Sequence, residues 1–244
     1  ATNVVESANI VKAAEEKNVD LVVGYTQRFR RKWLVAREQV ASGQLGDITS
    51  ATTRAFLNRM VAVTRLEANE DRSMLTPMVI SGTHALDVIL WVLGESKKPV
   101  EIYARSVAKA LAGLGTQDST YSIFTFDDGT LWSMSCSWGL PVVWPASTYS
   151  LEIGIVGTSG VLTIDDTHRD MVMATEKPWK SHRGDERHVN FLASYPPGDI
   201  SRGQFWGPMR EETNSWLARI YAGVDTPHCT ASEGHRNLMM TMAC

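Results

Sequence analysis

The 244-residue sequence lacks the features that mark membrane proteins, nucleic-acid-binding proteins and secreted proteins. Its longest apolar runs, such as VILWVLG, are far shorter than the roughly 20 apolar residues that a membrane-spanning helix needs. The first residues do not form a signal peptide. The formal net charge of −3 provides no general attraction to nucleic acid or anionic lipid. We therefore expect a cytoplasmic protein without nucleic-acid or membrane partners.

Cysteine is scarce, and histidine occurs without metal-binding spacing. An odd number of cysteines without a C-x-x-C pair indicates reduced thiols rather than a disulfide framework or a zinc site. These cysteines are Cys136, Cys229 and Cys244. His168, His182 and His188 lie in a polar stretch without the i,i+4 or carboxylate spacing of metal ligands. We therefore predict no metal site.

Residues 1–25 have the pattern of the end of a parallel α/β unit. SANIVKAAEEKNVDLVVGY predicts an amphipathic helix followed by a short apolar strand over 21–23, which Gly24 ends. A helix that leads into a fully apolar strand is typical of parallel α/β sheets. No further βαβ unit follows it.

Residues 26–244 predict a larger α+β domain on a mostly antiparallel sheet. Helices are expected in RRKWLVAREQVASG, over 78–93, in MREETNSWLARIYAG and after the capping box Thr230-x-x-Glu233. Strands are expected in ITSATTRAF, over 100–107, and in the hairpins STYSIFTFDDGTLWSMSCSW and SLEIGIVGTSGVLTIDD. Residues 166–206, rich in charge, Pro, Gly and His, predict a long irregular excursion.

One strand of this sheet alternates large apolar residues with serines. The apolar set is Trp132, Met134, Cys136 and Trp138, and the set between them is Ser133, Ser135 and Ser137. This alternation predicts a sheet with one large apolar face and one small polar face. The polar face is suited to close packing against helices, a ligand or a second subunit.

Five segments in order resemble the C-terminal part of the Gfo/Idh/MocA family of nicotinamide-dependent oxidoreductases. They are VVGYTQRF, VASGQLGDI, GTHALDVILWVLGE, IVGTSGVLTID and TPHCTASEGHRNL. The resemblance implies a Rossmann domain that holds NAD or NADP. It also implies a C-terminal, open-faced sheet with helices on one face, which binds a small-molecule substrate and often forms the dimer or tetramer interface.

The cofactor-binding half is not evident in the sequence. It contains no G-x-G-x-x-G fingerprint, and the Glu-Lys-Pro motif of the family would fall just before Ala1. The resemblance therefore implies that residues 1–25 are the last helix and strand of a dinucleotide-binding domain. Residues 26–244 would then be the substrate-binding and oligomerisation domain. We expect the chain to be inactive alone.

His84 is the candidate catalytic residue that the resemblance implies. An imidazole that titrates near neutrality can shuttle the substrate hydroxyl proton, whereas the structural alternative is a histidine that caps or fills the start of a helix. The family often carries an aspartate four residues earlier, and Ile80 stands there instead. An apolar neighbour would lower rather than raise the basicity of His84.

The resemblance also implies candidate ligands for substrate and cofactor. Tyr25 would line the nicotinamide and substrate pocket, and Arg28 would bind an acidic or hydroxylated substrate or pair with a surface carboxylate instead. Asp87 is a further candidate on the substrate side, with stabilisation of the helix N-terminus as its structural alternative. Trp138 and Trp144 would stack on a sugar or fill the core at a sheet edge. The basic residues from Arg28 to Lys32 fit a solvated helix face better than a nucleic-acid contact.

Two functions remain open from the sequence. The first is the substrate-binding and oligomerisation part of an NAD(P)-dependent oxidoreductase that acts on a CH–OH or C=O group of a sugar, polyol or cyclic diol, as a homodimer or tetramer. The second is a non-catalytic, ligand-sensing protein on the same scaffold, which Ile80 favours.

Overall fold

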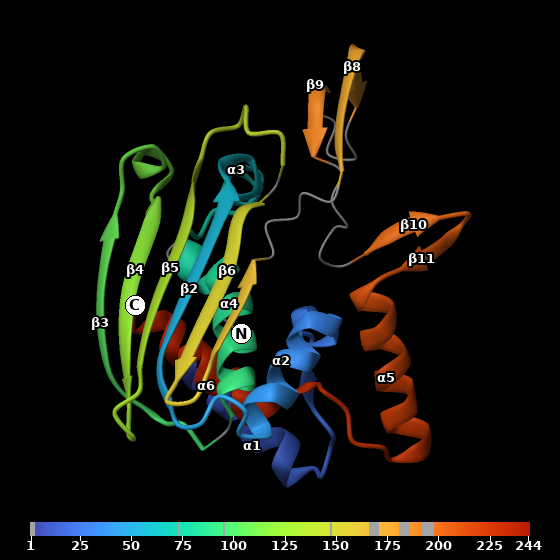
Figure 1. The fold of residues 1–244 in the computed structure, drawn as a ribbon. Helices are drawn as coiled ribbons and strands as arrows, with labels where there is room; N and C mark the ends of the chain where they lie inside the picture. The colour runs from blue at the N-terminus through green and yellow to red at the C-terminus, as the bar shows by residue number, and fades with distance from the viewer. Residues whose placement is uncertain are drawn as a thin grey trace.

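A six-stranded sheet forms the centre of the computed structural model (Figure 1). The structure describes residues 3–72, 74–94, 96–146, 148–165, 171–180, 186–191 and 198–244. The strand order is β3-β4-β5-β2-β6-β7, and β2 and β5 are parallel while the other neighbours are antiparallel. These strands are β2 (Ile48–Asn58), β3 (Pro99–Val107), β4 (Ser119–Phe126), β5 (Leu131–Leu140), β6 (Thr148–Gly157) and β7 (Val161–Asp165). The mostly antiparallel sheet expected from the sequence is confirmed.

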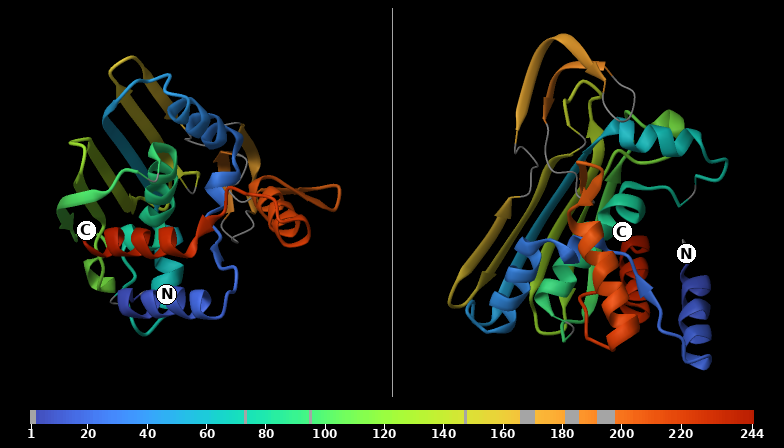
Figure 2. Two further views of the ribbon diagram at one scale, coloured as in Figure 1. Left: turned by 90° about the horizontal axis from the view of Figure 1, so that it is seen from below. Right: turned by 90° about the vertical axis from the view of Figure 1, so that its right-hand side faces the viewer.

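Helices cover one face of this sheet (Figure 2). The central one is α4 (Thr83–Leu93), against which α2 (Arg31–Ala41) and α6 (Ala231–Met242) pack. Every residue of α4 from Ala85 to Leu93 is buried, which is what a helix with an apolar surface all round requires. Each large apolar side chain buried in this way stabilises the fold by about 2 kcal/mol.

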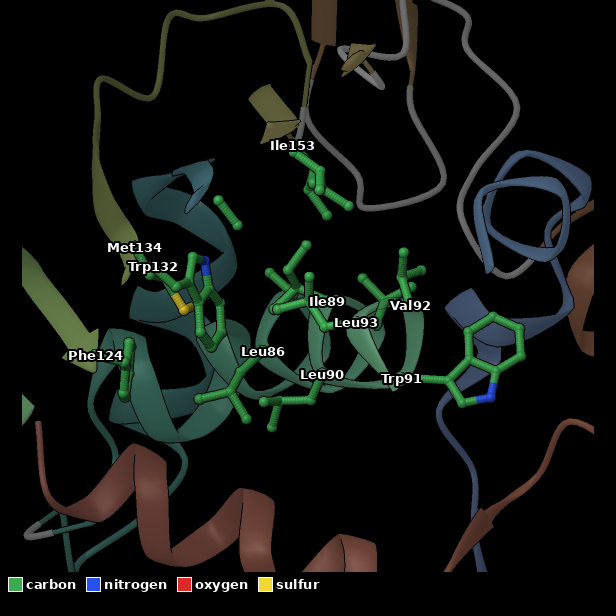
Figure 3. Close-up of a cluster of buried hydrophobic side chains, with 14 of the residues drawn as sticks. Leu86, Ile89, Leu90, Trp91, Val92, Leu93, Phe124, Trp132, Met134 and Ile153 are labelled. Atoms are coloured by element: carbon green, nitrogen blue, oxygen red, sulfur yellow. The ribbon is translucent and has the colours of Figure 1, made fainter. Parts of the chain in front are cut away.

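The core is formed where α4 meets the sheet. Figure 3 shows Leu86 and Ile89 of α4 among side chains of the strands, including Trp132, Met134 and Ile153. Trp132 is fully buried, and its indole Nε1 donates a hydrogen bond to Thr53 Oγ1 at 2.9 Å. The large apolar face that the alternation of β5 predicted is therefore the face beneath α4.

The start of α4 differs from the single regular helix expected over 78–93. Residues Met78–Gly82 form a π-helix, and α4 continues from Thr83. A Cβ atom at Gly82 would lie 2.7 Å from Met78 Sδ and 3.3 Å from Met134 Cε, so a side chain there would require these methionine side chains to move. The wider turn thus begins the helix directly against β5, and π-turns are frequent at functional sites.

The opposite face of the sheet is open among the described residues. Ser133 and Ser135 lie on it, as the alternation predicted, and each pairs across β4 with a large side chain, Ile123 and Tyr121 respectively. Large exposed apolar or aromatic residues on this face are Tyr103, Tyr121, Ile123, Leu131, Val156 and Val161. These exposed apolar residues gather on one face of the sheet and are not scattered singly over the surface. Exposed apolar patches of this kind mark interaction sites.

The short strand near the N-terminus does not show the parallel pairing that its pattern suggested. Beyond α1 (Val4–Glu16), β1 (Val22–Val23) pairs antiparallel with β12 (Cys229–Thr230), the only partner it has in the described parts of the chain. Ser7 of α1 also shares a 2.6 Å hydrogen bond with His235 Nδ1 of α6. The helix and strand were expected correctly, and the division into domains 1–25 and 26–244 stays a prediction.

The expectation of an irregular excursion over 166–206 is wrong. Within its described residues, β8 (Val172–Lys180) pairs with β9 (Glu186–Phe191), and β10 (Asp199–Ser201) pairs with β11 (Gln204–Trp206). These hairpins lie apart from the main sheet, beside α5 (Pro208–Ala222) (Figure 1). The strands of these hairpins do not pack on the main core, so their sequences lack the alternation of apolar and polar residues by which a strand is recognised.

The remaining described elements are α3 (Arg59–Glu67) and the short helices η1 (Thr26–Phe29) and η3 (Ala112–Leu114). Among the residues that the structure describes, no helix combines the length and apolar character that crossing a membrane requires.

Candidate functional site

His84 lies at the start of α4 with an exposed side chain. The ring of Tyr25 meets it edge-on, with ring centroids 5.6 Å apart and planes at 85°. The Tyr25 hydroxyl shares a 2.6 Å hydrogen bond with Thr83 Oγ1, the residue before His84. Burial raises the pKa of Tyr25 to about 12. The phenol is thus a neutral hydrogen-bonding group at ordinary pH, and it lies beside an imidazole, the side chain that general acid–base catalysis uses most often.

One turn further along α4, Asp87 is fully buried and binds Arg28. Arg28 Nε and Nη2 donate to the two carboxylate oxygens of Asp87 at 2.8 and 2.7 Å, a bidentate pair. The guanidinium, only 1% exposed, also donates to both carboxylate oxygens of Glu233 at 3.2 Å. Asn237 Nδ2 completes the group with a 2.7 Å hydrogen bond to Asp87 Oδ1. We call Arg28, Asp87, Glu233 and Asn237 the buried ionic cluster.

The electrostatics of the buried ionic cluster reflect competition between burial and pairing. Burial opposes the charge on Arg28, but the hydrogen bonds with Asp87 outweigh it and raise the pKa of Arg28 above its ordinary value. Burial raises the pKa of Asp87, while the bonds from Arg28 and Asn237 oppose that rise. For Glu233, the Arg28 charge and the Thr230 backbone N–H outweigh burial and lower the pKa. The arginine therefore holds the cluster together.

This geometry bears on three predicted site residues. Arg28 and Asp87 were candidates for substrate binding, and both direct their charged groups at one another inside the protein. The alternatives weighed from the sequence, a surface ion pair for Arg28 and a helix-terminus carboxylate for Asp87, do not describe a buried bidentate pair. The contacts therefore argue for structural work, and substrate binding by either residue stays a prediction. Tyr25 lies buried beside His84, and its role in lining a substrate or nicotinamide pocket stays a prediction.

Trp138 lies in a second buried cluster with Ala62, Leu66 and Leu111. It is 1% exposed, and its Nε1 donates to Ser81 Oγ at 2.8 Å. This is the core packing that was weighed against stacking on a sugar, and a role of Trp138 in substrate binding stays a prediction.

Trp144 is half-buried and meets the Tyr149 ring edge-on, with centroids 5.1 Å apart. Its carbonyl oxygen accepts hydrogen bonds from Asn58 Nδ2, at 2.9 Å, and from Arg187 Nη1. The loop that carries Trp144 is thus tied both to the end of β2 and to β9.

Ile80 occupies the place of the carboxylate that often accompanies the histidine in the resemblance. It is half-buried and packs against the second cluster, which contains Trp138 and Leu66. The apolar side chain at this position therefore helps to pack the π-helix against the second cluster.

The part of the chain that the structure describes contains no group of three or more His, Cys, Asp or Glu residues arranged to hold a metal ion, and the absence of a metal site stays a prediction. His188 Nδ1 lies 3.0 Å from the Thr175 carbonyl oxygen across the β8–β9 hairpin. His168 and His182 lie outside the described residues.

Three residues of this region were missed from the sequence as site residues: Thr83, Glu233 and Asn237. Glu233 was recognised as the acidic member of the capping box, and the structure confirms the box while its carboxylate also binds Arg28. Glu233 and Asn237 are four residues apart, which places them on one helix face. That spacing was the available signal, but only the fold brings Arg28 and Asp87 against it.

Comparisons with known proteins agree with this architecture. Residues 33–163 match the GFO/IDH/MocA C-terminal domain. The chain is 24% identical over 226 residues to the 2,7-anhydro-N-acetylneuraminate hydratase of Escherichia coli (strain K12), a match that covers 88% of this chain and 57% of the relative. It thus spans little more than half the length of that relative.

Two solved structures share the fold. One is scyllo-inositol dehydrogenase from Lactobacillus casei with bound NAD(H) and scyllo-inositol, with a TM-score of 0.70 and 17% identity over 99% of this chain and 66% of that one. The other is GenD2 from gentamicin A biosynthesis in complex with NAD, with a TM-score of 0.73 and 17% identity over 100% of this chain and 66% of that one. Because the domain match covers more than half of its residues, the chain belongs to the Gfo/Idh/MocA family.

Proposed function

We propose that this chain is the substrate-binding and oligomerisation part of a nicotinamide-dependent oxidoreductase that acts on a CH–OH or C=O group of a sugar, polyol or cyclic diol. The observation that carries the proposal is the exposed imidazole of His84, held beside Tyr25 at the carboxyl end of β1. The scyllo-inositol dehydrogenase with the same fold is a polyol enzyme that binds NAD(H).

His84 has one chemical task in this proposal. Its imidazole accepts the proton of the substrate hydroxyl as the carbinol carbon is oxidised, and it returns a proton to the oxygen in the reverse direction. Tyr25, which stays protonated, forms a neutral wall beside it. Bound nicotinamide would supply the acceptor for the hydride.

The residues of this chain fit one side of a nicotinamide site only. Tyr25 and His84 offer an aromatic edge and an imidazole, but the sequence contains no G-x-G-x-x-G loop to hold the pyrophosphate. Binding of the dinucleotide would therefore depend on residues outside this chain. The choice between NAD and NADP depends on the same residues.

The test is turnover by the natural gene product that contains this chain. We expect reduction of NAD⁺ or NADP⁺ in the presence of inositols, neutral sugars or sugar acids, followed by NAD(P)H absorbance. His84→Ala should lower kcat by about 100-fold or more with little change in cofactor affinity. His188→Ala, a histidine of β9 in the distant hairpin, is the matched control. Unchanged turnover in His84→Ala would remove His84 from the mechanism.

Two other functions are separable in the same experiment. The relative from Escherichia coli is named a hydratase, so product analysis must include net addition or loss of water, which consumes no nicotinamide. A ligand-sensing protein, which Ile80 in the carboxylate position favours, would bind a sugar or polyol without turning it over.

The open face of the sheet supports self-association as the second part of the proposal. Its strand register places a row of polar and charged residues across the sheet: Arg105, Tyr121, Ser135, Arg54, Glu152 and Asp165. Arg105 on β3 and Asp165 on β7 stand at opposite ends of this row, while Arg54 on β2 and Glu152 on β6 between them form an ion pair with each other. A two-fold axis that lies between two such faces and runs along the strands brings the Arg105 end of one row to the Asp165 end of the other, as an isologous interface allows.

The oligomer is tested by sedimentation of the 244-residue chain at micromolar concentration. We expect a dimer or tetramer that Ile123→Arg, within β4 on this face and 48% exposed, converts to a monomer with unchanged circular dichroism. Ile220→Arg is the control, because Ile220 is 56% exposed on α5, away from this face. A well-folded wild-type monomer would contradict the proposed interface.

A further inference from the structure

Two side chains of one short segment hold the helix that carries His84 on both sides of that residue. Tyr25, the residue before η1, bonds Thr83 through its hydroxyl at 2.6 Å. Arg28, within η1, binds Asp87 through two hydrogen bonds of 2.7 and 2.8 Å. His84 thus lies between two residues of α4 that are both anchored to the turn following β1.

This turn is itself fixed by the rest of the fold. Arg28 also bonds Glu233 of α6, and the same Glu233 carboxylate caps the helix through the Thr230 N–H at 2.8 Å. Thr230 belongs to β12, which pairs with β1. The chain of contacts therefore closes on itself: β1, η1, α4, α6, β12 and back to β1. Buried charge-assisted bonds in such a closed network are stronger and more rigid than exposed ones.

We infer that Tyr25, Thr83 and Arg28 are positioning residues that fix the His84 imidazole relative to the end of β1. The inference rests on the proposed function for its purpose, since the end of β1 is where the cofactor side of the site would meet this chain. Displacement of a catalytic group by about 1 Å is enough to lower a rate by about 100-fold. Arg28 fixes the position of α4 as a whole, whereas the hydrogen bond between the Tyr25 and Thr83 hydroxyls fixes the residue next to His84. The hydroxyl pair is therefore the contact to alter in an experiment.

Substitutions of Thr83 distinguish a positioning role of its hydroxyl from a purely structural role of its side chain. Thr83→Val keeps the shape of the side chain but removes the hydroxyl, whereas Thr83→Ser keeps the hydroxyl and removes a methyl group. If the bond to Tyr25 positions His84, Val displaces the imidazole and Ser does not. If Thr83 only fills space, the two variants behave in the opposite order.

The first readout is the proton NMR spectrum of the six histidine rings in the 244-residue chain, with the His84 signals assigned by His84→Ala. The edge-on Tyr25 ring shifts those signals. We expect Tyr25→Phe and Thr83→Val to move the His84 resonances, and Thr83→Ser to leave them near their wild-type positions. Tyr221→Phe, at an 85% exposed tyrosine of α5, is the control. His84 signals that stay in place in both Tyr25→Phe and Thr83→Val would overturn the inference.

The second readout is turnover by the natural gene product. We expect Thr83→Val and Tyr25→Phe to lower kcat by about 10- to 100-fold with KM nearly unchanged, and Thr83→Ser to restore kcat. A loss confined to KM would overturn the positioning role. Should the wild-type protein show no turnover while the NMR signals move as expected, the positioning of His84 stands and the proposed oxidoreductase function fails.

Discussion

Removal of Arg28 should destabilise the chain more than removal of either of its carboxylate partners. In Arg28→Met, Asp87 and Glu233 would face each other in the protein interior without their shared cation. Breaking a buried ion pair in this way costs about 4 kcal/mol. In Asp87→Asn, Arg28 keeps Glu233, and the Asn oxygen still accepts one hydrogen bond, so the loss should be about 2 kcal/mol.

The difference should depend on pH. Burial already raises the pKa of Asp87, and the Arg28 bonds oppose that rise, so Arg28→Met raises the folded-state pKa further above the unfolded value of about 3.9. A carboxyl group with a raised folded-state pKa contributes stability that is present below its unfolded pKa and is lost as the pH rises through the folded pKa. The deficit of Arg28→Met relative to wild type should therefore be larger at about pH 8 than at about pH 5.

Urea unfolding of wild type, Arg28→Met and Asp87→Asn at both pH values measures these differences, because the midpoint shifts at constant slope report the change in free energy. The double variant Arg28→Met with Asp87→Leu is the cross-check and should be more stable than Arg28→Met alone, since it leaves a single carboxylate. Equal losses in the two single variants, or a deficit of Arg28→Met that shrinks as the pH rises, would refute the cluster as an arginine-centred network.

Further predictions concern the turns and the thiols. A Cβ at Gly157 would lie 2.2 Å from the Leu45 carbonyl oxygen, whereas one at Gly43 meets nothing within 4 Å; Gly157→Ala should thus cost about 3 kcal/mol by urea unfolding, and Gly43→Ala, at φ +76, about 1 kcal/mol. Burial raises the pKa of Cys136 to about 12, and the buried Cys229 has its pKa raised as well. Both thiols should therefore resist iodoacetamide near pH 8 until the chain is unfolded, and alkylation of Cys136 or Cys229 in the folded protein, located by peptide mass spectrometry, would contradict this.

The main sheet was predictable because its strands alternate. In β5, Trp132, Met134 and Cys136 face the core beneath α4 while Ser133 and Ser135 face outward, and that period of two is visible without any structure. The β8–β9 hairpin was not predictable in the same way. The side chains of its strands are mostly exposed, and the two strands pair with each other without packing on the main core.

The candidate site was predictable only in part. His84 and Tyr25 were expected together because the resemblance brought them together, and the structure places their rings in contact. The partners of Arg28 were not predicted, because a charged residue in a basic run is most simply interpreted as exposed to solvent. Asp87 and Glu233 lie 59 and 205 positions away from Arg28 along the chain, and separations of this kind carry no periodic signal.

Tertiary packing, rather than local sequence pattern, also explains why an apolar residue occupies position 80. An aspartate there would face the second cluster, against Trp138 and Leu66, where an unpaired carboxylate would lose solvation and hold its proton more tightly. Asp87, the carboxylate one turn after His84, is already bound by Arg28 and Asn237. A carboxylate cannot therefore be restored at position 80 by substitution alone, because the core beneath the π-helix would have to change with it. The orientation of His84, as proposed above, depends instead on Tyr25 and Thr83.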